Sequence, residues 1–84
     1  MYVHIGKDTI IPSKNIIAII NLEKLLNNKS MEEIKKEINL EKIIDISLGN
    51  KKSLLIAKNK EKTEGYISNI SSTTLAKRFQ KEIL

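Results

Sequence analysis

The N-terminal part of the chain has the hydrophobic pattern of β-strands. Residues 2–5 are mostly β-branched or aromatic and predict a strand, which the Gly-Lys-Asp sequence at 6–8 ends as a turn. Residues 9–11 resume extended structure until the Pro-Ser pair at 12–13, because proline lacks the N–H that a strand ladder needs. Residues 14–21 then give the strongest strand prediction in the sequence.

This last strand contains an uninterrupted apolar run, Ile-Ile-Ala-Ile-Ile at residues 16–20. A strand with one solvent-facing side alternates apolar and polar residues, so a continuous run indicates burial on both faces. We expect one face to pack on the core and the other to be covered by a helix or by another subunit.

Capping signals followed by helical spacing predict two helices. Residues 22–29 are ambiguous and form at most a short helical turn, but Ser30 and Glu33 have the spacing of a capping box. The helix that they begin should end near Asn39, and its apolar face is formed by Met31, Ile34 and Ile38. The serine pair at 71–72 caps a last helix. One face of that helix is formed by Leu75, Phe79 and Ile83.

The remaining segments predict strands joined by a Gly-Asn turn at 49–50 and a charged hairpin tip at 59–64. These strands are residues 42–48, 53–57 and 65–70. The predicted order is strand, strand, helix, strand, strand, strand, helix. We therefore predict one α+β domain over residues 1–84, a small antiparallel sheet with a central short helix and a C-terminal helix.

The size and composition of the chain leave a tight core, self-association or both as its means of support. A domain of 84 residues buries a modest fraction of its surface, and disulfides, metals or oligomerisation usually support such domains. The sequence has no cysteine and a single histidine, which excludes a disulfide framework and a Cys or His zinc site. We expect no metal and no cofactor.

The sequence also indicates a cytoplasmic protein. Its first eight residues lack a basic segment followed by an apolar one, so we expect no signal peptide. The longest apolar run has five residues, whereas a membrane helix needs about 20. We therefore expect no membrane partner.

The positive charge lies entirely in the second half of the chain. Residues 1–48 carry seven basic and seven acidic side chains, whereas residues 49–84 carry eight basic and three acidic ones, the whole surplus of +5. Between Gly49 and Lys60 there are four lysines and no acid. Such asymmetry indicates an anionic partner, most simply nucleic acid, although a solvated lysine-rich surface gives the same pattern.

Catalysis has little support in the sequence. His4 is the one imidazole and lies on a predicted strand, where a structural or surface role is more common. The sequence at 6–9 lacks the glycine spacing of a phosphate loop and fits a hairpin turn better. We predict no catalytic residue, no enzyme activity and no small-molecule substrate.

Three sets of basic residues are candidates for nucleic-acid contacts. They are Lys51 and Lys52 after the glycine turn, Lys58, Lys60 and Lys62 on the hairpin tip, and Lys77, Arg78 and Lys81 on the last helix. In the first set, neighbouring strand residues point to opposite faces, so one surface should receive only one of the two lysines. In the third, Arg78 can pair with Glu82. Few aromatic residues are present, which favours duplex recognition through charge and shape over base stacking.

Three segments resemble the bacterial extracellular matrix regulatory proteins, the RemA/RemB-like family, with the RemB branch as the nearer match. They are MYVHIG at 1–6, IIPSKNIIAI at 10–19 and YISNISSTTLAKR at 66–78. The resemblance implies a DNA-binding regulator of the kind found mainly in Firmicutes, where RemA-type members activate biofilm matrix genes. It also implies a ring-like homo-oligomer and a fold related to the LytTR DNA-binding domain.

The basic site of the family carries over only in part. RemA-like members have an arginine at the position of Asn15, beside Lys14, and two arginines at the positions of Asn50 and Lys51, before Lys52. Lysine keeps the charge but loses the bidentate geometry of arginine, so backbone binding should survive better than base readout.

We therefore expect a homo-oligomeric regulator that binds double-stranded DNA through its backbone. The expected contact residues are Lys51, Lys52, Lys14 and Asn50. A self-assembling interaction or scaffold module without nucleic-acid binding is the alternative, favoured by asparagine at the family's arginine positions. RNA binding is a third possibility.

Overall fold

The computed structural model describes the backbone of residues 1–83 and the side chains of residues 1–81. Its elements, in chain order, are β1 (Tyr2–Gly6), β2 (Thr9–Pro12), the 3-10 helix η1 (Ser13–Asn15), β3 (Ile16–Asn21), α1 (Leu22–Leu25), α2 (Met31–Ile38), β4 (Lys42–Asp45), β5 (Ser53–Asn59), β6 (Lys62–Ser68) and α3 (Ser72–Ile83). The predicted α+β class, the short central helix and the C-terminal helix are confirmed.

The predicted capping box begins α2. The Ser30 hydroxyl oxygen accepts a hydrogen bond from the Glu33 N–H at 3.2 Å, and the Glu33 carboxylate accepts one from the Ser30 N–H at 3.0 Å. These hydrogen bonds, the backbone one first, lower the pKa of Glu33 below its ordinary value. Asn39 ends the helix in the left-handed conformation, as residues at helix C-caps commonly do.

The strands form a two-stranded sheet, β1–β2, and a four-stranded sheet of order β3-β5-β6-β4. Three neighbouring strands of the larger sheet are antiparallel, as predicted, but β4 pairs with β6 in parallel. The segment between β4 and β5 passes across the end of β6, so β6 separates two strands that are consecutive in the sequence. The larger sheet is therefore mixed, which the prediction of antiparallel hairpins missed.

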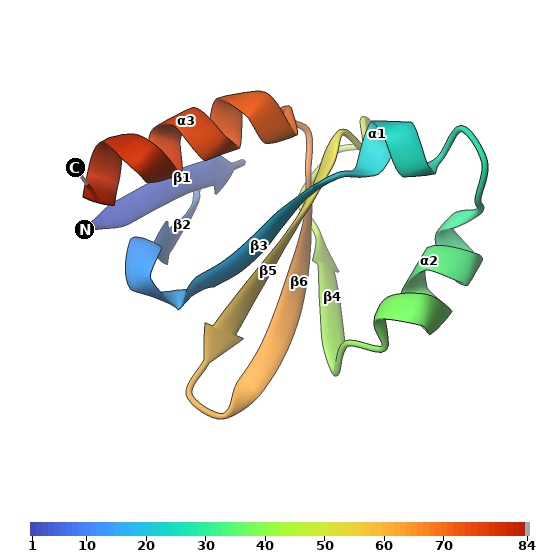
Figure 1. Cartoon of the computed structure of the whole chain (residues 1–84), viewed down its shortest axis with the longest axis horizontal. Helices are drawn as coiled ribbons and strands as arrows, with labels where there is room; N and C mark the ends of the chain where they lie inside the picture. The colour runs from blue at the N-terminus through green and yellow to red at the C-terminus, as the bar shows by residue number, and fades with distance from the viewer. Residues whose placement is uncertain (84) are drawn as a thin grey trace.

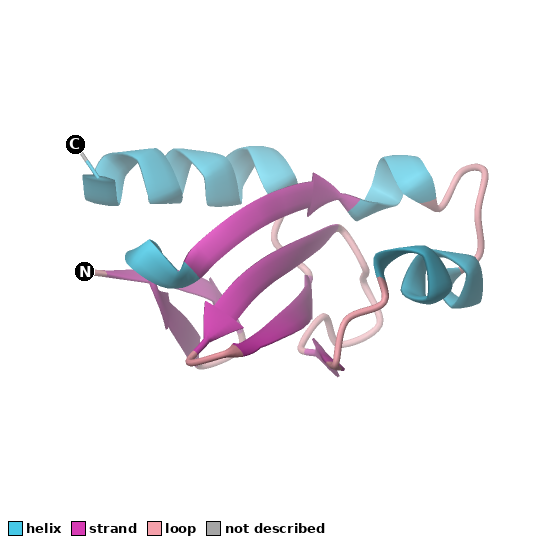
Figure 2. Cartoon of the chain, turned by 60° about the horizontal axis from the view of Figure 1, so that its bottom comes forward, coloured by secondary structure: helices cyan, strands magenta, loops and turns pink. Residues whose placement is uncertain are grey.

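Both faces of the four-stranded sheet are covered, because successive residues of its strands point to opposite sides. On one side, Leu55 and Ala57 of β5 pack with Leu75 of α3 and with Val3 and Ile5 of β1. Leu54 of β5 belongs to a second cluster on the other side, with residues of α1 and α2. Figure 1 shows α3 and the β1–β2 hairpin on one side of the sheet and α1 and α2 on the other, and Figure 2 shows the same layers from a second direction.

The face predicted for the last helix is confirmed where the structure describes it. Leu75 is completely buried and Phe79 is half-buried. The side chain of Ile83, the third predicted member, lies outside the described side chains.

The strand predicted at 14–21 differs from the structure in two respects. The strand begins at Ile16, because Lys14 and Asn15 belong to the 3-10 helix η1 that follows Pro12. Its apolar run is not buried throughout, since Ile17 is 57% exposed. The ladder to β5 shifts register between Ile16 and Ala18, which leaves Ile17 as the extra residue of a bulge on an edge strand. The prediction holds for Ile19, which packs on the first cluster, and for Ile20, which packs on the second.

Candidate nucleic-acid interface

The segment between β4 and β5, residues 46–52, forms a loop across the end of β6 and is called here the 46–52 loop. The Ile46 N–H donates to the Ile67 carbonyl at 2.9 Å, and the Lys52 N–H donates to the Ser68 carbonyl at 2.9 Å. The Lys52 carbonyl in turn accepts hydrogen bonds from the first two N–H groups of α1, at 3.1 and 3.2 Å. Both ends of the loop are therefore held by the backbone of the fold.

A tight turn forms the tip of the 46–52 loop. The Asn50 N–H donates to the Ser47 carbonyl at 3.1 Å, which closes a four-residue β-turn. Its two central residues, Leu48 and Gly49, have φ values of 56° and 88°, and positive φ at both positions is the signature of a type I′ turn. The predicted Gly-Asn turn is thus present one residue earlier, with Asn50 exposed as its last residue.

Asp45, the last residue of β4, connects the turn to the basic residues. Its carboxylate accepts hydrogen bonds from the Ser47 N–H at 2.9 Å and from the Ser47 hydroxyl at 2.6 Å, and it lies 3.7 Å from the Lys51 ammonium. The Ser47 hydroxyl is the main cause that lowers the pKa of Asp45, with smaller contributions from the Ser47 N–H and the charge of Lys51, against the opposing effect of partial burial. Asp45 is therefore charged at neutral pH and partly neutralises Lys51.

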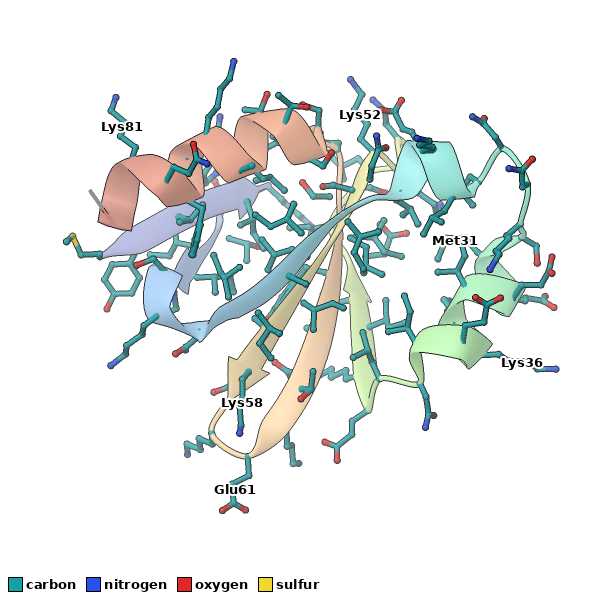
Figure 3. The ribbon with its side chains drawn as sticks, viewed as in Figure 1. Met31, Lys36, Lys52, Lys58, Glu61 and Lys81 are labelled. Carbon is teal, nitrogen blue, oxygen red and sulfur yellow. The ribbon has the colours of Figure 1, made fainter. Side chains whose placement is uncertain are left out.

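The two lysines of the first predicted set differ in their surroundings. The Lys51 side chain, 34% exposed, faces Asp45. Lys52 is half-buried, and Figure 3 shows its side chain pointing away from the ribbon near the start of α1. Lys52 is thus the more available of the two for a phosphate.

The start of α3 lies at the same end of the sheet as the 46–52 loop (Figure 1). The Ser71 hydroxyl oxygen caps this helix by accepting a hydrogen bond from the Thr74 N–H at 3.2 Å, which confirms the predicted cap. A helix N-terminus carries a partial positive charge. The helix end and the lysines therefore add charge of the same sign to this part of the surface.

Lys14 does not join the other predicted contact residues within one chain. It precedes Ile16, which pairs with Ala57, whereas Lys51 and Lys52 precede Ser53, which pairs with Asn21 at the other end of β3. The length of β3, about 20 Å at 3.3 Å per residue, separates the two ends. The structure thus places Lys51, Lys52 and Asn50 together and Lys14 elsewhere. Lys14 also lies in the helix η1, outside the strand that was predicted to begin there.

The other two basic sets lie away from the loop. Lys58, Lys60 and Lys62 are exposed at the β5–β6 hairpin tip, the opposite end of the sheet. On α3, Lys77 and Lys81 are exposed, but the Arg78 guanidinium donates to the His4 carbonyl at 2.8 Å and so ties the helix to β1. The side chain of Glu82, the partner expected for Arg78, lies outside the described side chains.

Sequence reasoning missed Asp45 and Ser47 as parts of this site. An Asp followed two residues later by a serine is a common way for a carboxylate to hold a turn, and this spacing was the available signal. In the part of the chain that the structure describes, no group of three His, Cys, Asp or Glu side chains is arranged to hold a metal ion. The described helices include none that is long and apolar enough to cross a membrane.

Comparison with known proteins gives one result that covers nearly the whole chain. The model of a family described as RemA-like, extracellular matrix regulatory protein A-like, matches residues 2–79. A search of curated proteins finds no match. The matched range includes β1 to β6, the 46–52 loop and most of α3.

Proposed function

The chain belongs to the RemA-like family of extracellular matrix regulatory proteins, and on this premise we propose that it is a cytoplasmic DNA-binding transcription regulator that binds the duplex backbone as a homo-oligomer. The observation that carries the proposal is the 46–52 loop, which presents Lys51, Lys52 and Asn50 on backbone held at both ends. A rigid basic surface suits phosphate binding, because fewer side chains and backbone bonds must be ordered when the duplex arrives.

The expected role of the lysines is phosphate neutralisation. Asn50, exposed at the end of the turn, is a polar donor for the same backbone or for a base edge. Lys14 contributes at a separate place, about the length of β3 away, so that one protomer offers two contact regions. In an oligomer each protomer repeats these contacts, and linked contacts strengthen binding through effective concentration.

The oligomer has its own support in exposed apolar side chains of the first 17 residues. They are Met1, Tyr2, Ile10 and Ile17. Tyr2 pairs with Pro12 and His4 with Ile10 in the β1–β2 ladder, so Tyr2 and Ile10 share the outer face of the hairpin while Val3 faces the core. A second copy of the chain is the proposed cover for this face. Light scattering of Ile10→Lys should then give a smaller particle than the wild type, while Asn27→Lys, on an exposed loop, should not.

The experiment that tests DNA binding is affinity for a duplex as a function of salt concentration. The logarithm of the affinity should fall against the logarithm of the salt concentration with a slope of about −0.9 for each phosphate neutralised. The double variant Lys51→Ala, Lys52→Ala should flatten this slope. The matched control is Lys60→Ala, Lys62→Ala, which removes the same charge from the hairpin tip and should leave most of the slope intact.

Two results would contradict the site assignment or the function. An equal change of slope in both double variants would mean that the duplex responds to the net charge of the protein and not to the position of the lysines. A wild-type protein that binds no duplex at low salt while remaining oligomeric would favour the scaffold alternative. The ion pair between Asp45 and Lys51 also favours that alternative, since it occupies one of the expected contact residues. Competition between duplex DNA and RNA distinguishes DNA binding from RNA binding, the third possibility.

A further inference from the structure

The tip of the 46–52 loop places a leucine in a position that is unfavourable in two ways. Leu48 is 75% exposed, so its apolar surface stays in water, and its φ of 56° lies in the left-handed region that a residue with a Cβ avoids. Neither of the two core clusters includes Leu48. The fold therefore gains no packing from this side chain to offset either cost.

The turn itself favours another residue. Type I′ turns strongly prefer Asn-Gly at their central positions, because asparagine and glycine tolerate positive φ. Gly49 already meets this preference at the second position, where its φ is 88°. The backbone conformation, and not a lack of space, favours glycine there, because a Cβ added at this position would meet nothing within 4 Å. A leucine at the first position is thus a local exception, and strained backbone is most often retained at functional sites.

The surroundings of Leu48 indicate what it contacts. The turn that carries it ends at Asn50 and is followed directly by Lys51 and Lys52, whose positive charges attract a polyanion to this end of the sheet. The other large apolar side chains that the structure describes as exposed all lie within the first 17 residues, in a separate part of the chain. Leu48 is therefore an exposed apolar group on the same loop as Lys51 and Lys52, and duplex DNA is the partner whose charge fits these lysines.

We propose that Leu48 is an apolar contact residue for double-stranded DNA, which enters a groove and packs on carbon atoms there while the neighbouring lysines bind phosphates. This inference rests on the proposed function. A β-turn is about as wide as the two-stranded ribbon that the major groove admits. The carbon atoms available in that groove are the thymine methyl groups and, at its walls, the deoxyribose rings.

The test measures duplex affinity and stability together. The probe is a labelled A·T-rich duplex of about 30 base pairs, roughly three helical turns, and a second duplex of the same sequence in which deoxyuridine replaces every thymidine. Leu48→Asn should raise the melting temperature of the protein by a few degrees, because it suits the turn, yet weaken duplex binding about threefold to tenfold, as the loss of a partly buried leucine contact does. Leu48→Met, which keeps an apolar side chain, should bind like the wild type.

The deoxyuridine duplex identifies the carbon atoms. If Leu48 packs on thymine methyl groups, the wild type should bind that duplex more weakly and Leu48→Asn should not distinguish the two duplexes. If it packs on deoxyribose, the wild type should bind both duplexes equally and Leu48→Asn should weaken both.

Three results would overturn the inference. If the wild type binds the duplex and Leu48→Asn binds it equally well, Leu48 makes no contact and the proposed function stands without it. If Leu48→Asn weakens binding but also changes the particle mass in light scattering, the leucine serves a contact between copies of the chain. If the wild type binds neither duplex at low salt, the proposed function fails and the inference fails with it.

Discussion

The two ends of the four-stranded sheet carry similar charge but are built differently. At the end with the 46–52 loop, Ser47, Ser53 and Ser68 are completely buried, and their hydroxyl groups donate to the Asp45 carboxylate, the Ile70 carbonyl and the Ile5 carbonyl. At the end with the hairpin tip, Lys58, Lys60 and Lys62 are exposed, with Glu61 among them. Figure 3 labels Lys52 at the first end and Lys58 and Glu61 at the second.

This difference teaches that a count of lysines does not locate a binding surface. Exposed lysines on a short hairpin tip keep their rotamer freedom and lose it when they bind, which costs free energy. The lysines of the 46–52 loop follow backbone that buried hydroxyl groups and ladder hydrogen bonds already hold in place. The variants below test whether this difference in construction is real, beginning with the largest expected effect.

Ser68→Ala should destabilise the protein by about 1–3 kcal/mol, the usual cost of a lost buried hydrogen bond. The Ser68 hydroxyl donates to the Ile5 carbonyl and its oxygen accepts from the Ile70 N–H at 2.9 Å, so both partners lose a bond when it is removed. Lys62→Ala at the hairpin tip should change stability by about 0.5 kcal/mol or less. Urea denaturation measures both variants, and equal losses would mean that the two ends are held equally.

Asp45→Asn should strengthen duplex binding about twofold to fivefold, as expected for a partly exposed ion pair worth up to about 1 kcal/mol. The carboxylate lies 3.7 Å from the Lys51 ammonium and would also repel an approaching phosphate. Glu61→Gln is the matched control, since it removes the same charge from the hairpin tip and should leave affinity nearly unchanged. Equal gains in both variants would show that only net charge matters.

The sequence was sufficient for what depends on local spacing. The capping box of Ser30 and Glu33 and the serine cap of α3 followed from neighbouring residues. The predicted order of elements had two strands before the first helix, whereas the structure has three, β1, β2 and β3. The parallel β4–β6 pair and the bulge at Ile17 depend on how distant segments meet, and no local pattern encodes them. Lys14 and Lys51 look equivalent in the sequence as basic residues near the start of a strand, yet the antiparallel register of β3 and β5 places them at opposite ends.

The same distinction applies inside the candidate site. A glycine turn with lysines after it was visible in the sequence, and the structure brings Asn50, Lys51 and Lys52 together as expected from their adjacency. The charge of Lys51 was overestimated, because its partial neutralisation by Asp45 requires the chain to fold back across the loop. The sequence also did not predict that Leu48 lies at the exposed tip, since leucine rarely occupies a position with positive φ.

The stability of the loop end should depend on pH through Asp45. The pKa of its carboxyl group is lower in the folded protein than its ordinary value of 3.8, so the stabilisation is fully present above pH 3.8 and is lost as the pH falls through the folded value. Because the side chain is 44% exposed and screened by water, we expect a loss of about 0.5 kcal/mol or less. Urea midpoints at pH 6 and at about pH 3 should therefore differ less in Asp45→Asn than in the wild type.

A variant of Glu33 serves as a control that distinguishes the effect of Asp45 from the acid response of the rest of the protein. Its pKa is also lowered, by the capping box, so Glu33→Gln should reduce the acid sensitivity of α2 while leaving the contribution of Asp45 intact. Additive effects in the double variant would support independent sites, as expected for groups without shared partners. An Asp45→Asn variant with the full acid sensitivity of the wild type would show that the hydrogen bonds from Ser47 add no stability.

A further small effect compares the residues with positive φ at the two ends. Lys60, the first residue of the two-residue hairpin loop, has a φ of 61°, and glycine is the preferred residue at that position. Lys60→Gly should therefore stabilise the protein by about 0.5 kcal/mol. This is the free-energy cost of positive φ in a residue with a Cβ, minus the larger entropy that glycine loses on folding. Leu48→Asn should stabilise it similarly, and thermal denaturation measures both. Lys60→Gly removes one exposed positive charge and should lower duplex affinity by no more than that charge explains, because Lys60 makes no apolar contact with the duplex. Leu48→Asn removes no charge, so its loss of duplex affinity should reflect the lost apolar contact. Equal loss of affinity in the two variants would remove the functional distinction between the ends of the sheet.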